Sequence, residues 1–300
     1  MTGASGFIGQ EVIKLCIARK HRVLALTRSH LAHCKHKVFS QLHDVNVRDI
    51  EGHDAIIHLA GIAHSKEASS ADYYKHNTEL TIHLAEVAAQ ANVKRFVFVS
   101  SIGVNGKYTR GNPFRGADFP NPHNDYTKSK LEAELGLKKV ASQTGLEVVI
   151  IRPTLVYGAT APGNFKLLKT LVSMLPILPF GSINNRRSFI FVKNLADLIE
   201  LCSQHPLAAG QTFLASDGKS VSIKEFTNQL AIGLDKTIFQ LPIPSSVMLL
   251  VGRLTNKSEV VKQLIDDLEV DSSCAGKLLD WKPPYSLEKA MLHMNRDIHD

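Results

Sequence analysis

The feature of this sequence that most constrains its fold is an alternation of short apolar runs with longer amphipathic segments. The apolar runs occupy 23–26, 55–59, 96–99 and 148–151. The amphipathic segments occupy 7–19, 71–91 and 126–142. Short continuous apolar runs predict strands buried on both faces of a parallel sheet, and the segments between them predict crossover helices. The pattern therefore predicts an α/β fold with a doubly wound parallel sheet.

The alternation weakens after Pro153, where Pro and Gly interrupt the chain more often. One more strand–helix unit is predicted at 188–202, and a strand at 211–215. Ser222 and Glu225 have the spacing of a capping box, which predicts the start of a helix. We therefore predict a sheet domain formed by 1–155 with 188–215, and a smaller, mostly helical C-terminal lobe formed by 156–187 with 216–300.

The charge of the chain bears on its partners. The 35 Lys and Arg residues exceed the 28 Asp and Glu residues, and this net charge of +7 is spread along the sequence. A dispersed positive charge favours a small anionic ligand over nucleic acid, although a basic surface without a particular partner is an alternative. We expect no nucleic-acid partner.

The cysteine, histidine and hydropathy patterns of the sequence bear on its cellular location and on metal binding. Cys16, Cys34, Cys202 and Cys274 lie far apart without a CxxC pair, which predicts neither a disulfide framework nor a zinc site and favours the cytoplasm. The histidines of 30–36 have no carboxylate at ligand spacing, so we expect no metal site. The longest apolar run, 238–254, is interrupted by prolines and predicts no membrane insertion.

A glycine-rich turn opens the first predicted helix, with Gly3, Gly6 and Gly9 at regular spacing around Phe7 and Ile8. A dinucleotide pyrophosphate needs a backbone without side chains that it can approach closely, and a helix N-terminus that supplies amide donors. A plain strand-to-helix turn is the alternative, because three glycines alone are a weak signal.

Tyr126 and Lys130 lie one turn apart at the start of a predicted helix. A lysine ammonium near a phenol lowers the pKa of the phenol toward a value that is useful for proton transfer. A solvated helix face with Lys128 and Glu132 is the alternative. The apolar run 96–99 ends in Ser100 and Ser101, and ligands of parallel sheets bind at the carboxyl ends of strands. These serines and the glycine turn are therefore expected at one crevice.

In combination, these motifs resemble the extended short-chain dehydrogenases/reductases, and among them the NAD-dependent epimerase/dehydratase family, whose fold is a Rossmann-type sheet with a C-terminal substrate lobe. Ser101 precedes Tyr126 by 25 positions, which is similar to the spacing of the family's catalytic serine and tyrosine. The segments 58–61, with Asn77 after it, and 152–158 also resemble the family. The resemblance implies that Ser101, Tyr126 and Lys130 are catalytic.

The resemblance also implies binding residues. The cofactor would be bound by Gly3, Gly6, Phe7, Ile8, Gly9, Arg28, Asp44, Val45, Leu59, Ala60, Lys130 and Pro153. The substrate would be bound by Ser101, Asn164 and Arg187, with Asn164 and Arg187 on the nucleotide diphosphate; a turn residue and a surface cation are the alternatives for these two. NAD or NADP(H) is the implied cofactor. Arg28 follows the run 23–26, where an arginine accommodates a 2′-phosphate, and so favours NADP(H) unless it only faces solvent.

Within the family, the segments 178–181 and 278–284 are most similar to the UDP-glucose 4-epimerase-like branch. The expected function is an NAD(P)-dependent epimerase that transfers hydride at sugar C4 of UDP-glucose or UDP-N-acetylglucosamine. An NADPH-dependent 4-reductase of UDP-4-keto-6-deoxy sugars for surface polysaccharide is an alternative, and a non-catalytic NADP(H)-binding sensor is another. The family resemblance also implies a homodimer that pairs the helices 79–91 and 126–142.

The sequence departs from the family before the glycine turn. The family has a strand of about five apolar residues there, whereas this sequence has Met1 alone. That strand lies in the middle of the sheet, so we expect a gap between the strands that would flank it. We hypothesise that the native chain carries an upstream strand rich in Val and Ile.

Overall fold

The central sheet has four parallel strands in a computed structural model that describes residues 1–32, 34–63 and 67–299. Their spatial order is β3-β4-β5-β9, which requires crossover connections and confirms the predicted α/β fold. The four strands are β3 (Ala55–His58), β4 (Arg95–Val99), β5 (Glu147–Pro153) and β9 (Thr212–Ala215). In the register of this sheet, Val97 lies beside Val149 and Phe98 beside Ile150.

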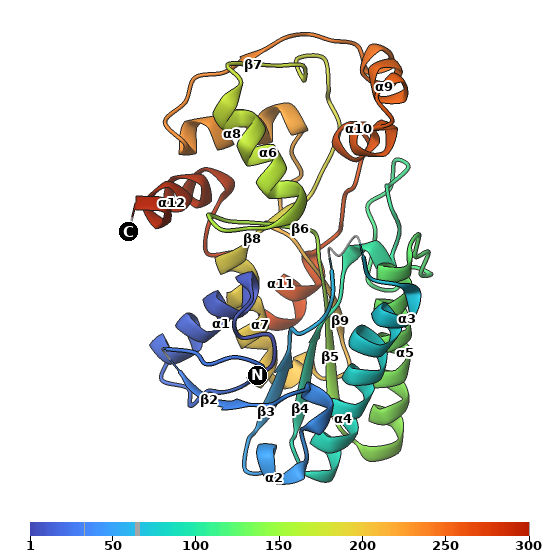
Figure 1. Cartoon of the computed structure of the whole chain (residues 1–300), viewed down its shortest axis with the longest axis vertical. Helices are drawn as coiled ribbons and strands as arrows, with labels where there is room; N and C mark the ends of the chain where they lie inside the picture. Colours follow the sequence, from blue (N-terminus) through green and yellow to red (C-terminus); the bar gives the residue numbers. More distant parts are fainter. Residues whose placement is uncertain (33, 64–66, 300) are drawn as a thin grey trace.

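Helices cover both faces of the sheet (Figure 1). Helices α1 (Phe7–Ala18) and α7 (Val192–Gln204) pack together on one face, and α4 (Leu80–Gln90) and α5 (Asp125–Thr144) cover the other. Alternate residues of β4 enter the two cores, so that Val97 packs with α7 and Phe98 with α4 and α5. Burial on both faces explains why each of these strands is a continuous apolar run.

A separate two-stranded sheet lies beside the central one. It pairs β1 (Leu24–Thr27) with β2 (Lys35–Val38) in parallel. Thr2 forms parallel bridges to both Leu26 and His58, so the first residues of the chain connect the two sheets at one end. Below these bridges, a cavity of about 780 Å³ lies between β1 and β3, with Leu24 and Ile57 in its wall. The expected gap in the sheet is present.

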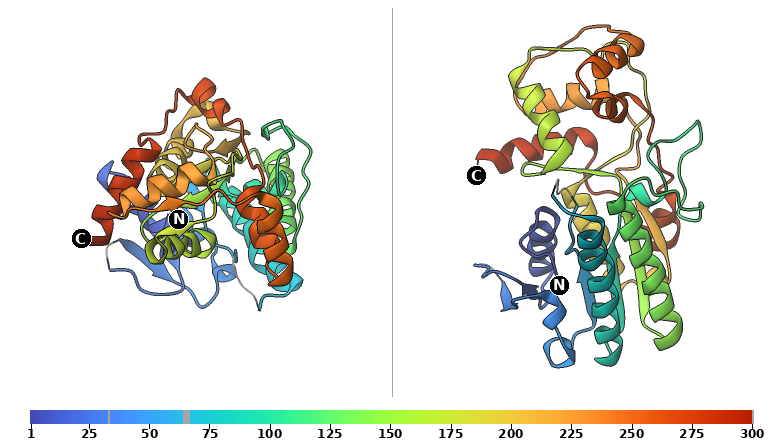
Figure 2. Two further views of the ribbon diagram at one scale, coloured as in Figure 1. Left: turned by 90° about the horizontal axis from the view of Figure 1, so that it is seen from above. Right: turned by 45° about the vertical axis from the view of Figure 1, so that its right-hand side comes forward.

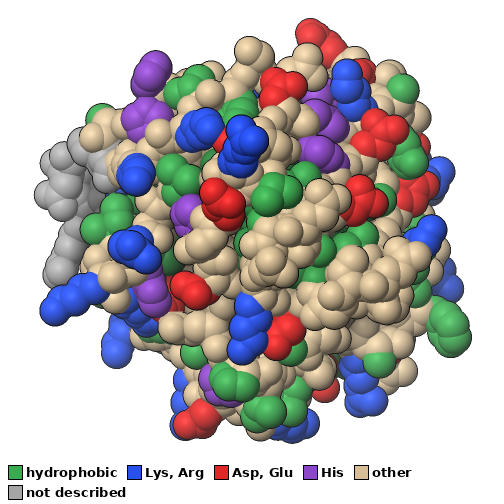
Figure 3. Space-filling model, turned by 90° about the horizontal axis from the view of Figure 1, so that it is seen from below, with side chains coloured by type: hydrophobic (Ala, Val, Ile, Leu, Met, Phe, Trp, Pro, Cys, Tyr) green, Lys and Arg blue, Asp and Glu red, His purple; other side chains and the backbone are tan. Residues whose placement is uncertain are grey.

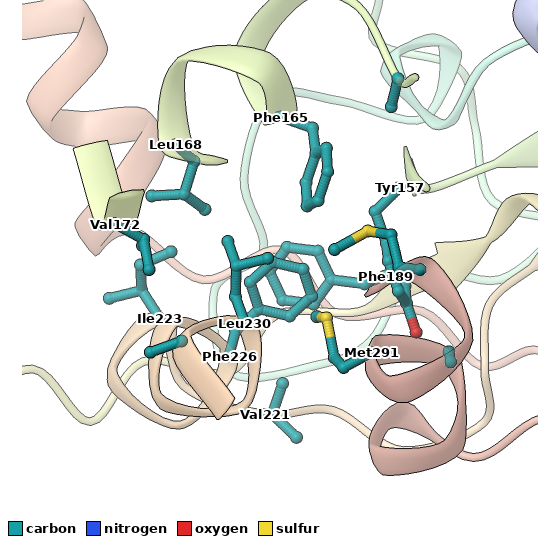
Figure 4. Close-up of a cluster of buried hydrophobic side chains, with 14 of the residues drawn as sticks. Tyr157, Phe165, Leu168, Val172, Phe189, Val221, Ile223, Phe226, Leu230 and Met291 are labelled. Atoms are coloured by element: carbon teal, nitrogen blue, oxygen red, sulfur yellow. The ribbon is translucent and has the colours of Figure 1, made fainter. Parts of the chain in front are cut away.

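The C-terminal part of the chain lies above the carboxyl ends of the strands (Figures 1 and 2). Its elements are β6 (Leu155–Tyr157), α6 (Gly163–Met174), β7 (Ile177–Leu178), β8 (Phe189–Phe191), α8 (Ile223–Gly233), β10 (Phe239–Gln240), α9 (Ser245–Leu254), α10 (Ser258–Ile265) and α12 (Leu287–His299). Its core is aromatic, and Figure 4 shows Phe165, Phe189 and Phe226 converging there. The rings of Phe189 and Phe226 are stacked, with centroids 3.9 Å apart.

One C-terminal segment packs against the sheet domain. Helix α11 (Ser273–Leu279) contacts β9, and Ala275, Leu279 and Trp281 belong to the same buried cluster as α1 and α7. The indole Nε1 of Trp281 donates to Asp197 on α7 at 2.8 Å. The division of the chain into two lobes at the predicted boundaries remains a prediction, and α11 adds a contact between the segments assigned to them.

Over the described ranges 1–32, 34–63 and 67–299, none of the helices combines the length and the apolar character needed to span a membrane. The same residues contain no group of three or more His, Cys, Asp or Glu side chains that could hold a metal ion. On the face seen from below in Figure 3, Lys and Arg side chains are interspersed with Asp and Glu.

Candidate active site

The glycine turn has a conformation that requires glycine. Gly3 has a φ of +68°, and a Cβ built on it would lie 2.7 Å from the backbone nitrogen of Ala60. A Cβ on Gly9 would lie 2.1 Å from the carbonyl oxygen of Gly3. Gly6 is the N-cap of α1 and contributes no side-chain cap. The turn therefore leaves bare backbone at a helix N-terminus, which fits a dinucleotide pyrophosphate.

A buried hydrogen-bond chain fixes this turn to strand β3. The hydroxyl of Thr2 lies 2.6 Å from Nδ1 of His58, and Nε2 of His58 lies 2.9 Å from the hydroxyl of Thr81. Thr81 donates its own proton to the carbonyl of Asn77 at 2.6 Å, so Nε2 must carry the imidazole proton and Nδ1 must accept from Thr2. Burial, with the nearby charge of Lys130, lowers the pKa of His58 to about 3. His58 is therefore a neutral structural link.

The other predicted cofactor residues lie along the same edge of the sheet. Leu59 and Ala60 follow β3 and contact the glycine turn, Phe7 and Ile8 begin α1, and Pro153 ends β5. Arg28 is exposed directly after β1. The carboxylate of Asp44 accepts from the backbone nitrogen of Gln41, and the carbonyl of buried Val45 accepts from His83. Contact of these residues with a cofactor remains a prediction.

Strand β4 and helix α5 bring the three predicted catalytic residues together. Ser101 is the second residue after β4, and Tyr126 and Lys130 lie in the first two turns of α5, which Asn124 caps. Ser101 and Tyr126 lie close enough for the serine hydroxyl to shift the pKa of the phenol. Nζ of Lys130 donates to the carbonyl of Val99 at 3.0 Å. The serine, the phenol and the ammonium therefore meet at the carboxyl end of β4.

Burial controls the protonation of this group. It raises the pKa of Tyr126, and the hydroxyl of Ser101 opposes that shift. It lowers the pKa of Lys130 to about 8, and the carboxylate of Glu134 opposes that shift. Lys130 also lies 4.6 Å from the centroid of the Phe98 ring, which favours the charged ammonium. At neutral pH, Lys130 is still mostly protonated.

A π-helical segment supports the site from the side. The helix predicted over 71–91 is divided into α3 (Ser70–Tyr73), a π-helix (Tyr74–Glu79) and α4. The wider turn directs Asn77 inward, where its side chain bonds both backbone groups of Ile62, at 2.8 and 2.9 Å, and donates to Ser129 at 3.0 Å. Asn77 therefore fixes the loop after β3 to α5.

Asn164 and Arg187, the two residues predicted to bind the diphosphate, both contact helix α10 or the residue that follows it. Asn164 is the second residue of α6 and donates to Gln263 at 3.3 Å. Arg187 donates to the carbonyl of Asp266 at 2.6 Å. Burial lowers the pKa of Arg187 to about 10, and the charges of Asp266 and Asp267 oppose this shift, so the guanidinium stays charged at neutral pH. The sequence analysis missed Gln263, which has no motif of its own.

The loop 105–125 connects this region with the predicted catalytic residues. It follows the 3-10 helix Ile102–Val104 and ends at the start of α5. On the way it crosses to the C-terminal part, where the backbone nitrogens of Thr109 and Phe114 donate to the carbonyls of Asp267 and Glu269, both at 2.8 Å. In the structure, the loop connects the two parts of the chain beside the site.

Residues 1–215 match the family model described as "NAD dependent epimerase/dehydratase family". The chain belongs to this family. A "UDP-glucose 4-epimerase" of Vibrio cholerae is 40% identical over 300 residues, which cover 96% of this chain and 92% of that protein. An Escherichia coli O157:H7 family relative named "N-acetyl-alpha-D-glucosaminyl-diphospho-ditrans,octacis-undecaprenol 4-epimerase" is 24% identical, over 97% of this chain and 92% of that protein.

Solved structures share the fold of this family member. UDP-N-acetylglucosamine 4-epimerase from Bacillus cereus superposes with a TM-score of 0.82 at 21% identity, covering 100% of this chain and 98% of that one. MoeE5, solved in complex with UDP-glucuronic acid and NAD, superposes with a TM-score of 0.77 at 20% identity, covering 98% and 96%. The chain is thus an enzyme of the epimerase/dehydratase family with a Rossmann-type fold, similar to UDP-glucose 4-epimerase.

Proposed function

We propose that this enzyme is an NAD(P)-dependent 4-epimerase of a nucleotide sugar, UDP-glucose or UDP-N-acetylglucosamine. The observation that carries the proposal is the meeting of Ser101 and Tyr126 at the carboxyl end of β4, with Lys130 one turn farther along α5. A phenol beside an ammonium, at the carboxyl end of a strand and near a glycine turn, is suited to removing a proton from a hydroxyl while hydride leaves the same carbon.

The side chains would divide the reaction as follows. Tyr126, as the phenolate, accepts the proton of the sugar C4 hydroxyl, and Ser101 donates a hydrogen bond to the reacting oxygen. Burial raises the pKa of Tyr126. Lys130 would favour the phenolate, because an ammonium near a phenol stabilises its ionised form. A bound nicotinamide would supply the hydride acceptor and later the hydride donor. Tyr126 then returns the proton once hydride has been added to the opposite face of the ketone.

The substrate would be oriented by its diphosphate. Arg187 stays charged at the base of the C-terminal part, and a guanidinium can meet two phosphate oxygens at once. Asn164 adds an exposed amide at the start of α6. A UDP-sugar is favoured because the Vibrio cholerae relative, 40% identical, is named for UDP-glucose.

A second candidate is an NADPH-dependent reductase of a UDP-4-keto-6-deoxy sugar. The observation that favours it is Arg28, exposed directly after β1 where an acidic residue would suit NAD. The same three catalytic residues would serve the return of hydride alone. We also expect a homodimer through α4 and α5, where Leu135 is 57% exposed; sedimentation of the purified enzyme would test it.

The deciding experiment identifies the cofactor and the reaction together. Purified protein is denatured, any released nicotinamide is identified by mass, and the native protein is incubated with UDP-glucose, UDP-N-acetylglucosamine, or a UDP-4-keto-6-deoxy sugar with NADPH. Stoichiometric NAD⁺ and formation of the C4 epimer would support the epimerase. NADPH oxidation only with the keto sugar would support the reductase. Neither reaction, with a nicotinamide still bound, would contradict both and support a sensor.

A further inference from the structure

A buried carboxylate lies one turn beyond Lys130 on helix α5. Glu134 is 1% exposed, and its oxygens are fully engaged by neighbouring strands. The hydroxyl of Ser100, at the end of β4, donates to Glu134 at 2.6 Å. Arg152 of β5 forms a bidentate ion pair with it, in which Nε donates at 2.9 Å. The carboxylate is therefore fixed between the helix and two strands.

The network continues to the base of the loop 105–125. Arg152 is 2% exposed. Its Nη1, which does not take part in the ion pair with Glu134, donates a hydrogen bond to the side-chain oxygen of Asn105 at 2.9 Å. Asn105 is 2% exposed and donates to the carbonyl of Arg115 at 2.9 Å. Buried ion pairs of this kind add little stability compared with apolar side chains of the same size. Their position beside the catalytic lysine suggests a different role.

Several charged or titratable groups face Lys130. Tyr126 and Glu134 lie on its own helix, Arg152 lies behind Glu134 on β5, and His58 faces it from β3. His58 is neutral at physiological pH, since burial lowers its pKa to about 3. Burial lowers the pKa of Lys130, and among the described residues Glu134 is the group that raises it. Glu134 is thus the counter-charge of Lys130.

We propose that Glu134 is a positioning residue, which Ser100 and Arg152 hold in place so that Lys130 stays charged beside Tyr126. Arg152 and Asn105 connect the Glu134 carboxylate to the base of the loop 105–125. One hydrogen-bond network therefore holds both the counter-charge of Lys130 and the loop that borders the site. The catalytic consequence rests on the function proposed above. The electrostatic relationship between Glu134 and Lys130 can be measured without it.

The first test titrates the Lys130 amine by NMR in protein labelled with ¹³C-lysine, without substrate, with the signal assigned by its loss in Lys130→Met. In Glu134→Gln, Arg152 remains as an unbalanced positive charge, and the Lys130 midpoint falls by about 1 unit or more. In Arg152→Gln, Glu134 remains unbalanced and the midpoint rises. If Glu134 and Arg152 were only structural, either substitution would loosen the site and admit water. The Lys130 midpoint would then rise in both variants.

Glu147→Gln is the matched control. Glu147 pairs with Arg95, which is 3% exposed, at the other end of the same two strands. This variant breaks a comparable ion pair far from Lys130 and should leave the midpoint unchanged. If Glu134→Gln alone does not fold, the double variant Glu134→Gln/Arg152→Gln decides. The electrostatic role predicts that the rise seen in Arg152→Gln disappears in the double variant, whereas a structural role predicts that it remains. Shifts of equal sign in the two single variants, or no shift in Arg152→Gln, would overturn the proposal.

The second test measures the pH dependence of turnover. Loss of charge on Lys130 should end activity at high pH. In Glu134→Gln, the alkaline limb of the pH–rate profile should therefore move to lower pH, by the same number of pH units as the Lys130 midpoint measured by NMR. An active wild type whose alkaline limb does not follow the NMR shift would contradict the inference alone. An inactive wild type with the expected NMR shifts would contradict the proposed function and leave the electrostatic inference standing.

Discussion

The hydroxyl of Thr2 lies 2.6 Å from Nδ1 of His58, which holds the first residues of the chain at the end of strand β3. Met1 and Thr2 there occupy the place of a strand, since the amino group of Met1 donates to Leu24 and the backbone nitrogen of Thr2 donates to Ile57. Burial lowers the pKa of the Met1 amino group to about 6. The chain thus buries an amine at the mouth of a cavity of about 780 Å³ between β1 and β3.

An apolar extension before Met1 is expected to stabilise this fold. Five residues such as Val-Ile-Val-Leu-Val would pair with both open strand edges, fill the cavity and replace the buried amine by an amide. Each buried apolar side chain contributes roughly 1.5–3 kcal/mol, so the free energy of unfolding should rise by several kcal/mol. Urea denaturation measures the change. A Gly-Ser extension of equal length is the control, and an equal effect of both extensions would show that the cavity does not accept a strand.

Removing the phenol oxygen should abolish turnover and leave the fold intact. We expect Tyr126→Phe to lower kcat by about 10²–10⁴, because a positioned acid–base group contributes about that much. Its binding of the nicotinamide cofactor and its melting temperature should stay close to those of the wild type. Tyr74→Phe is the control, since Tyr74 is 46% exposed in the π-helix. Equal activity of the two variants would exclude Tyr126 as the base.

The sequence was sufficient to predict the sheet, and the family resemblance assigned the proposed catalytic residues to one end of it. Continuous apolar runs locate β3, β4 and β5, because a strand covered on both faces has no polar side to obscure the pattern. The 25-residue spacing of Ser101 and Tyr126 resembles that of the family, which implied that the two act together, and the structure brings them close to one another. The apolar runs could be recognised because each depends only on neighbouring residues.

The supporting network could not be predicted from the sequence. Glu134, Arg152 and Asn105 belong to three different elements, and each alone resembles an ordinary polar residue of a helix, strand or loop. The tautomer of His58 likewise depends on Thr2 and Thr81, which are distant in sequence. Such contacts depend on how elements pack, and single-sequence periodicity does not contain that information.

A methyl group on Gly9 should disrupt the cofactor turn. In Gly9→Ala, the new Cβ would meet the Gly3 carbonyl at 2.1 Å, so the backbone of the turn must shift. We expect a loss of about 1–3 kcal/mol in unfolding free energy and a loss of dinucleotide binding in a calorimetric titration with NAD⁺ and NADPH. Gly276→Ala in helix α11 is the control, because its new Cβ would meet only the Trp281 carbonyl oxygen, at 3.3 Å. Wild-type binding by Gly9→Ala would refute the assignment of the turn.

The pH dependence of stability should contain a contribution from Asp217. Tyr157 and Asn194 each donate to this carboxylate at 2.7 Å. Burial nevertheless raises its pKa to about 6, above the ordinary 3.8. A raised carboxyl pKa favours the protonated folded form, so this stability is present below pH 4 and is lost as pH rises through 6, by at most about 3 kcal/mol.

The variant Asp217→Asn should lack this loss, because an amide does not titrate and can donate to the Tyr157 oxygen. Chemical denaturation of the wild type and the variant between pH 4 and 7 measures the difference, which should grow with pH. Asp54→Asn, at an exposed position, should follow the wild type. If the difference in unfolding free energy between Asp217→Asn and the wild type did not change between pH 4 and 7, Asp217 would already be ionised at pH 4.

The choice between epimerase and reductase should depend on Arg28. If this exposed arginine binds a 2′-phosphate, Arg28→Glu would weaken NADP(H) binding by about tenfold or more and leave NAD(H) binding unchanged or stronger, since a carboxylate accepts the ribose hydroxyls and repels the phosphate. Fluorescence titration with NADPH and NADH measures both affinities. Arg48→Glu, an equal change of charge at an exposed position of α2 (Val47–Ile50), separates local contact from the net charge of the protein.

The ratio of the two affinities then bears on the reaction. A wild type that prefers NADPH and loses the preference in Arg28→Glu would favour the reductase, because an enzyme that consumes reductant must exchange it in each turnover. A wild type with equal affinity for both, unchanged by Arg28→Glu, would mean that Arg28 faces solvent. In that case the observation that favours the reductase disappears, and the epimerase, which regenerates its own nicotinamide, remains as the function that the site supports.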